Sequence, residues 1–267
     1  MQNENLIHRN SKINYQVFGN GSKLLFCFHG YGETAESFGF LETLLGKDFT
    51  LIALNLPFHG ETEWNEGLLF TSEDLINIIS VLSKSKNQSI SLLGYSMGGR
   101  VALQLLQIMP KKIERLVLIA PDGLHKNFWY SFATQTWIGN KLFAFTMKHP
   151  GWLFTLMKIA GKLKLLNAAV IKIAHYYLDD ENERVLLYER WTTMRKFKPS
   201  LHVVKSAIKE NKIPVRFLFG AFDRIIVSNR NDFFTEDTEN IQAHVIEAGH
   251  QLLKEKYASS IVQLFYQ

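Results

Sequence analysis

Short apolar runs alternate with helix-patterned segments along the first 120 residues of the chain. Each run is continuously apolar and rich in β-branched or aromatic residues, which is typical of strands buried on both faces of a parallel sheet. The runs are KLLFCF at 23–28, TLIAL at 50–54, SISLL at 89–93 and RLVLIA at 115–120. The pattern therefore predicts four strands of one sheet.

Between these runs, apolar residues recur at helical spacing. The sets expected to share one helix face are Leu41, Leu44 and Leu45; Leu75, Ile78, Ile79 and Leu82; and Val101, Leu105, Ile108 and Met109. Strands that alternate with helices predict an α/β fold with a doubly wound, mostly parallel sheet and right-handed crossovers. At the N-terminus, Leu6–Phe18 has a polar centre near Asn10 and predicts an antiparallel hairpin.

The alternation stops after Pro121. From residue 122 to about 205 the pattern is helical and rich in large apolar residues. Strand-like runs return at 214–219 and 242–247, and a final helix is expected at about 251–265. We therefore predict a core built from residues 1–121 and 206–267, with residues 122–205 inserted as an α-helical cap, or lid.

The composition excludes several classes of protein. A chain of 267 residues buries a sizeable core, and one cysteine, Cys27, excludes an internal disulfide framework. Residues 1–10 are polar and unlike a secretory signal, and no uncharged apolar run reaches 18 residues. A cytoplasmic globular protein is the expectation.

The net charge of +5 is concentrated in the predicted cap. Residues 122–200 carry nine Lys and three Arg against six Asp and Glu, and residues 123–178 contain seven Lys, eleven aromatic residues and no acid. The favoured interpretation is that the aromatic residues pack on the core and the lysines are solvated. Recognition of an anionic substrate and contact of the cap with a membrane surface stay open. We expect no nucleic-acid partner, and the sequence leaves the oligomeric state undecided.

The sharpest chemical signal is GYSMGG at 94–99. A G-x-S-x-G motif alone is modest evidence, because it also arises by chance in unrelated chains. Here it directly follows a predicted strand and directly precedes a predicted helix. Such a tight turn strains the serine backbone and presents its hydroxyl in a pocket, with flanking glycines that allow close approach of the chain. This context predicts Ser96 as a nucleophile rather than an ordinary turn residue.

A serine nucleophile needs a base, and the base needs an orienting acid. Asp223, in GAFDR, and His250, in AGH, each follow a predicted strand at its C-terminal end, in the order acid then histidine. We predict these as acid and base. The alternatives are that Asp223 only caps a turn, that Asp122 is the acid, and that His250 only caps the final helix.

Two backbone N–H groups are expected to form an oxyanion hole. One belongs to Met97, directly after the nucleophile. The other belongs to Tyr31, in the glycine-rich loop HGYG that follows the strand predicted at 23–28. In the cap, Trp129 and Phe132 are candidates for the wall of an apolar substrate pocket.

Taken together, these motifs resemble the α/β-hydrolase fold superfamily, among its single-domain members with a helical cap. The resemblance covers essentially the whole chain and rests on HGYG at 29–32, NLPFHG at 55–60, GYSMGG at 94–99, GAFDR at 220–224 and AGH at 248–250. It implies Ser96 as nucleophile, His250 as base and Asp223 as orienting acid. A serine at the elbow argues against members that use aspartate there, namely haloalkane dehalogenases and epoxide hydrolases. The segment 55–60 departs from the commoner D-x-P-G-x-G form at Asn55 and Phe58.

The expected activity is therefore that of a serine hydrolase that cleaves a small to medium carboxylic ester or thioester through an acyl-enzyme. The substrate is a small molecule, apolar or anionic, with unspecified acyl length. No metal-ligand cluster or dinucleotide fingerprint is present in the sequence, so no metal or other cofactor is expected. Two alternatives remain: a carbon–carbon bond hydrolase or lyase-type enzyme with the same triad, and a ligand sensor that retains the triad without turnover.

Overall fold

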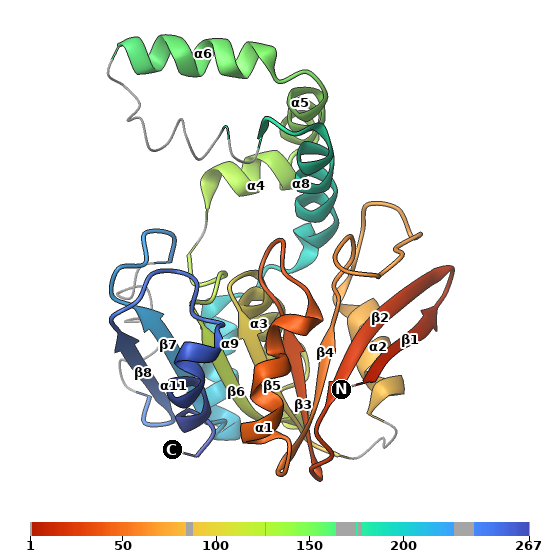
Figure 1. The fold of residues 1–267 in the computed structure, drawn as a ribbon, viewed down its shortest axis with the longest axis vertical. Helices are drawn as coiled ribbons and strands as arrows, with labels where there is room; N and C mark the ends of the chain where they lie inside the picture. The colour runs from red at the N-terminus through yellow and green to blue at the C-terminus, as the bar shows by residue number, and fades with distance from the viewer. Residues whose placement is uncertain are drawn as a thin grey trace. The chain divides into compact units, whose positions relative to one another are not determined.

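The computed structural model describes residues 2–83, 88–125, 127–163, 175, 178–226 and 238–266 and contains an eight-stranded sheet (Figure 1). The strands lie in the order β1-β2-β4-β3-β5-β6-β7-β8. Their bounds are β1 Gln2–His8, β2 Ser11–Phe18, β3 Lys23–Phe28, β4 Phe49–Leu54, β5 Ile90–Tyr95, β6 Ile113–Ile119, β7 Val215–Gly220 and β8 Ile241–Ile246.

The sheet is antiparallel at one edge and parallel elsewhere. β1 and β2 form the hairpin predicted for the N-terminus, and β2 pairs antiparallel with β4. The remaining neighbours, from β4 through β3, β5, β6 and β7 to β8, pair in parallel. The predicted fold class, a doubly wound and mostly parallel sheet, is confirmed. In a parallel sheet the carboxyl ends of the strands meet at one edge, and the candidate site residues follow those ends.

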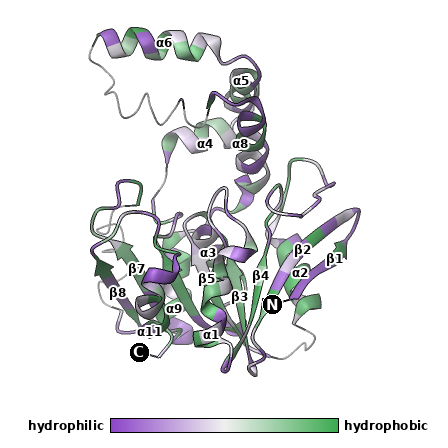
Figure 2. Cartoon of the chain, in the orientation of Figure 1, coloured by the Kyte–Doolittle hydropathy of each residue, from purple (hydrophilic) through white to green (hydrophobic). Residues whose placement is uncertain are grey.

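The burial of each strand matches its sequence pattern. Every residue of β5 and β7 is buried, as continuous apolar runs require when both faces of a strand are covered. The edge strands β1 and β8 carry exposed side chains. Figure 2 shows the same contrast, with hydrophobic colour along the central strands and polar colour on β1.

Helices cover both faces of the sheet. α2 and α9 both contact α3 on one face, while α11 contacts the short helix η1 on the other. The bounds are η1 Ala35–Leu41, α1 Glu42–Leu45, α2 Ser72–Leu82, α3 Met97–Ile108, η2 Pro110–Lys112, α9 Leu201–Asn211, η5 Glu255–Tyr257 and α11 Ala258–Gln263. α2 begins at a capping box in which Thr71 accepts from the Asp74 N–H and Asp74 accepts from the Thr71 N–H.

Three predictions of helical detail are wrong. Ile108, the last residue of α3, is exposed and does not share the buried face of Val101 and Leu105. Leu44 does not share the buried face of Leu41 and Leu45 but is exposed, because the segment forms a 3₁₀ helix and a single α-turn rather than one regular helix. The final helix is shorter than residues 251–265. After His250 the chain makes a tight turn, in which Leu252 donates its N–H to the His250 carbonyl at 2.8 Å, and helix begins only at Glu255.

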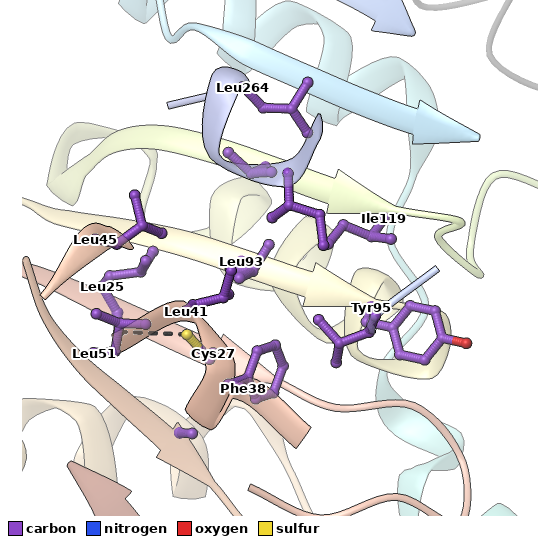
Figure 3. Packing of buried hydrophobic residues seen from close by; sticks show 14 of the residues in the cluster. Leu25, Cys27, Phe38, Leu41, Leu45, Leu51, Leu93, Tyr95, Ile119 and Leu264 are labelled. Carbon is purple, nitrogen blue, oxygen red and sulfur yellow. Dashed lines mark hydrogen bonds between the residues drawn. The ribbon is translucent and has the colours of Figure 1, made fainter. Parts of the chain in front are cut away.

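The core on the α11 side of the sheet is a continuous set of apolar side chains (Figure 3). Leu25 and Cys27 come from β3, Leu93 and Tyr95 from β5, and Ile119 from β6. The same cluster takes in Leu41, Leu45 and Leu264 from the helices above the sheet. Tyr95 lies at the carboxyl end of β5, so this core extends to the edge of the sheet where the candidate site begins.

Over the residues that the structure describes, the chain divides into two compact units. The first, which we call the sheet unit, comprises Met1–Glu66, Thr71–His125 and Phe197–Gln267; the second, the helical unit, comprises Gly67–Phe70 and Lys126–Lys196. α9 thus belongs to the sheet unit, whereas the sequence division placed its first residues in the inserted segment. That the helical unit serves as a cap stays a prediction.

The helical unit has its own interior, which aromatic and polar side chains share. Its elements are α4 Phe128–Gln135, α5 Trp137–Lys148, α6 Gly151–Lys162, α8 Glu181–Thr193 and η3 Met194–Lys196. Phe143 packs against Tyr188 and Trp191, with ring centroids 5.4 and 5.7 Å away. The buried Arg184 side chain donates to the carbonyls of Met147 and Leu178, both at 2.8 Å. Among the residues described, no helix has the length and apolarity needed to cross a membrane.

Candidate active site

Ser96 occupies a sharp turn between β5 and α3. Its φ of 48° and ψ of −115° lie in a region that non-glycine residues rarely adopt, so the turn is strained. Two bonds hold it in place. The Ser96 N–H donates to the Ile119 carbonyl at 3.0 Å, and the Asp122 N–H donates to the Ser96 carbonyl at 2.8 Å. The strand–turn–helix context expected around GYSMGG is therefore present.

Close packing around this turn explains its glycines. A Cβ atom on Gly98 would lie 1.9 Å from the carbonyl oxygen of Phe28, at the end of the neighbouring strand β3. One on Gly30 would lie 2.9 Å from the Tyr95 ring and 3.3 Å from the Ser96 Cβ. The loop after β3 therefore lies directly against Ser96, and only glycine fits at these two positions.

The three predicted side chains meet at the carboxyl edge of the sheet. Ser96 Oγ lies 3.0 Å from His250 Nε2, and His250 Nδ1 lies 2.8 Å from Asp223 Oδ2. The Asp223 carboxylate is buried, and its second oxygen accepts the N–H groups of Ile225 and Ile226 at 2.8 and 2.9 Å. These bonds fix the carboxylate, which in turn orients the imidazole toward the serine.

The loops after β7 and β8 bring the acid and the histidine together. Phe222 donates its N–H to the Ala248 carbonyl at 2.9 Å, which ties the two loops between Asp223 and His250. On the other side, the Tyr95 hydroxyl donates to the His250 carbonyl at 3.1 Å. Tyr95 is thus a positioning residue that sequence reasoning missed, although it stands inside the GYSMGG motif beside Ser96.

The alternative acid is engaged elsewhere. Asp122 forms an ion pair with Arg100 of α3 and accepts the N–H of Gly123 at 2.6 Å. The nitrogen of His250 that faces away from Ser96 instead contacts Asp223. The geometry therefore favours Asp223 over Asp122 as the partner of the histidine.

The two predicted oxyanion donors flank the serine. Met97 is the first residue of α3, where the backbone N–H has no partner within the helix. Tyr31 follows Gly30 in the loop that lies against Ser96. This loop is anchored by the buried His29, whose Nε2 accepts the Leu56 N–H at 3.1 Å and whose Nδ1 lies 2.8 Å from the Gly30 carbonyl. Oxyanion stabilisation by Met97 and Tyr31 stays a prediction.

A second residue missed from the sequence is Glu33, which follows HGYG. Burial raises the pKa of its carboxyl from 4.5 to about 7, although nearby Lys254 acts in the opposite direction. One of its oxygens, Oε2, is buried without a hydrogen-bond partner among the described residues. Burial also raises the pKa of the Tyr95 hydroxyl, and the charges of Glu33 and Asp223 raise it further. The signal in the sequence was only an acid beside a glycine-rich loop.

The segment at 55–60 accommodates its departures from the family form. Asn55 accepts the Ala35 N–H at 2.7 Å and donates to the Asn14 side chain at 2.6 Å, so the amide ties this segment to two neighbours. Phe58 stands where the commoner form has glycine and keeps a positive φ of 63°. A positive φ at a non-glycine residue is strained.

The predicted pocket residues lie in the helical unit. Trp129 is 73% exposed on α4, and Phe132 stacks on Phe128 with ring centroids 6.4 Å apart. The pocket role of Trp129 and Phe132 stays a prediction. Within the described residues, no group of three His, Cys, Asp or Glu side chains is arranged to hold a metal ion.

Comparison with known proteins agrees with this fold. A family model described as alpha/beta hydrolase fold matches residues 23–146. A thermophilic esterase from Thermogutta terrifontis superposes with a TM-score of 0.68 at 16% identity, covering 100% of this chain and 98% of that one. A thioesterase domain from the curacin biosynthetic pathway gives 0.66 at 14% identity, covering 100% and 99%. Just under half of the chain thus resembles the alpha/beta hydrolase fold family in sequence, and the whole chain shares the fold of the two solved structures.

Curated relatives match over shorter stretches. A putative 2-succinyl-6-hydroxy-2,4-cyclohexadiene-1-carboxylate synthase of Bacillus subtilis (strain 168) is 32% identical over 101 residues, 37% of this chain and 36% of that protein. A pimeloyl-[acyl-carrier protein] methyl ester esterase of Salmonella heidelberg (strain SL476) is 30% identical over 106 residues, 40% of each. The matched segment thus spans well under half the length of either relative. The names esterase and synthase are therefore those of proteins that this chain resembles over that segment.

Proposed function

We propose that the protein is a serine hydrolase that cleaves a carboxylic ester or thioester through an acyl-enzyme. One observation carries the proposal: Ser96 Oγ, the His250 imidazole and the Asp223 carboxylate form one chain with separations of 3.0 and 2.8 Å. A serine hydroxyl is a weak nucleophile until a neighbouring base removes its proton. The strained elbow holds that hydroxyl where His250 can reach it.

In this mechanism each residue has one task. The His250 Nδ1–H donates to Asp223, which leaves Nε2 unprotonated to accept the proton of Ser96 as Oγ attacks the carbonyl carbon. The N–H groups of Met97 and Tyr31 stabilise the oxyanion of the tetrahedral intermediate. His250 then protonates the leaving alcohol or thiol. Water repeats the sequence on the acyl-enzyme, and Ser96 is regenerated.

The class of substrate is supported by relatives rather than by the site alone. The names esterase and thioesterase belong to proteins that this chain resembles over part of its sequence or in its fold. In both reactions a nucleophile attacks an acyl carbon and an oxyanion develops. The proposed roles of Ser96 as nucleophile and of the Met97 and Tyr31 N–H groups as oxyanion donors suit both reactions. We therefore assign an acyl ester or thioester, of small to medium size, as the substrate class.

Turnover of p-nitrophenyl acetate, p-nitrophenyl butyrate and an acyl thioester tests the proposal. Ser96→Ala is expected to abolish turnover, whereas Ser259→Ala, at an exposed serine of α11, leaves it unchanged. Acylated enzyme, seen as a mass increase on rapid quenching, is expected in the wild type and in Ser259→Ala but not in Ser96→Ala. Full turnover by the Ser96→Ala protein would sink the proposal.

A second candidate is a lyase-type reaction with the same three residues. It is favoured by the similarity to the Bacillus subtilis protein named as a putative synthase. His250 would then act as a base on the substrate itself, and esters would be poor substrates. Slow ester turnover combined with normal labelling of Ser96 by a fluorophosphonate would favour this reaction over ester hydrolysis.

A further inference from the structure

Two helices of the helical unit turn an apolar stripe outward. On α6, Trp152, Leu156, Ile159 and Leu163, at the end of the helix, follow one another at spacings of four, three and four residues, so they line one face. Their exposed fractions are 37%, 52%, 50% and 63%. A surface helix ordinarily buries such a stripe against its own domain. In α6 the buried side chain is Met157, on another side of the helix.

α5 repeats the arrangement. Ile138, Leu142 and Phe145 recur at spacings of four and three residues, and all three are exposed. The buried side chains of this helix, Thr146 and Met147, lie elsewhere on its circumference. Figure 2 shows polar and hydrophobic colours alternating along α6. Contiguous apolar surface of this kind marks an interaction site more often than single exposed residues do.

Lysines accompany both stripes. Lys141, Lys148 and Lys162 each follow a stripe residue by three positions, which places them along the same flank. All three are exposed, and Lys141 Nζ lies 3.9 Å from the centroid of the Trp137 ring. No Asp or Glu occurs from residue 123 to residue 178. The surface therefore combines apolar and aromatic side chains with positive charge that no acid in this stretch offsets.

From these observations we propose that α5 and α6 dock on a membrane surface that contains anionic phospholipid. An amphipathic helix with Trp, Leu and Phe on one face and lysines beside it binds in the interface between headgroups and acyl chains. The lysine stems reach along the apolar side chains toward the phosphates, and tryptophan favours the same depth. The 12 residues of α6 span only about 18 Å, so the helix lies in the interface and does not cross the bilayer.

The proposal is independent of the proposed hydrolase activity, because none of these residues belongs to the candidate active site. Ser96→Ala protein is expected to bind vesicles as the wild type does. The two proposals therefore fail in different experiments. Vesicle binding by the Ser96→Ala protein tests membrane docking, and turnover of a soluble ester by the wild type tests catalysis.

Vesicle flotation with the full chain tests the docking. Binding is expected to vesicles of phosphatidylcholine mixed with phosphatidylglycerol, to fall by about tenfold on phosphatidylcholine alone, and to weaken as salt is raised. The double variant Leu156→Glu/Ile159→Glu is expected to lose binding by about tenfold or more. Val81→Glu, at an exposed apolar residue of α2, is the matched control and binds as the wild type does.

A second measurement places the stripe at the bilayer. Lipids that carry a spin label in the acyl chain are expected to quench tryptophan fluorescence. Trp137 of α5 and Trp152 of α6 both lie on the proposed docking helices. The double variant Trp137→Phe/Trp152→Phe is therefore expected to remove most of that quenching, and Trp152→Phe part of it, while vesicle binding persists. Absence of binding to anionic vesicles by folded wild-type protein would overturn the proposal. So would binding that Leu156→Glu/Ile159→Glu leaves intact, or a preference of the stripe for purified acyl carrier protein, which is acidic, over vesicles.

Discussion

The sheet unit and the helical unit use similar apolar residues in opposite ways. In β5 and β7 every side chain is buried, and the apolar runs of the sequence become the core. In α5 and α6 apolar residues at ordinary core spacing face outward beside lysines. Burial of the first set stabilises the fold and strains Ser96 into place. The second set leaves apolar side chains exposed, and on our proposals the sheet unit carries the chemistry while the helical unit binds a membrane surface.

The largest expected effect lies in the sheet unit. Ser96→Ala and His250→Ala are each expected to lower kcat by about 10⁴-fold or more, and the double variant by no more than either, because the residues act as one unit. Steady-state kinetics on a soluble ester measures all three proteins.

Leu156→Ala is the corresponding alanine substitution in the helical unit. It is expected to change kcat for a soluble ester by no more than about a factor of two. An equally large loss from Leu156→Ala would break the proposed division between the units. Additive losses from Ser96→Ala and His250→Ala would show that the two residues work separately.

Two glycines give a smaller and purely structural contrast. Gly98→Ala is expected to destabilise the protein by about 3 kcal/mol or more, because the new Cβ meets the Phe28 carbonyl. Gly151→Ala, at the start of α6, meets nothing within 4 Å and is expected to be neutral or stabilising by about 0.5 kcal/mol. Urea unfolding of both variants gives the comparison. A tolerated Gly98→Ala would contradict the close approach of β3 to the elbow.

The sequence was most informative where local pattern and burial coincide. The run SISLL predicts β5, and the order of serine, acid and histidine predicts which side chains meet, because strand ends share one edge of the sheet. The positions of Tyr95 and Glu33 were not predictable, since their contacts depend on loops from distant strands. The same limit applies to α6: the spacing of Trp152, Leu156 and Ile159 is that of a buried face, and only the structure shows that it is exposed.

A further expected effect, smaller than that of Gly98→Ala, is a pH dependence in the sheet unit. Since burial raises the pKa of folded Glu33 to about 7, the folded state holds its proton more tightly than the unfolded state. Its contribution to the free energy of unfolding therefore falls as pH rises from 4.5 to about 7, by about 1 kcal/mol after solvent screening. Urea midpoints at several pH values check this, with Glu33→Gln as the protein that lacks the dependence. Identical pH profiles for the two proteins would contradict a buried, protonated Glu33.

The central claim is that Ser96 is the nucleophile that His250 and Asp223 activate. Labelling of the full-length protein with a fluorophosphonate, followed by mass-spectrometric mapping of the adduct, tests it without knowledge of the substrate. The account predicts a single adduct on Ser96, its loss in Ser96→Ala and a much slower reaction in His250→Ala. Modification of a different serine, or labelling of Ser96 at the same rate without His250, would contradict it.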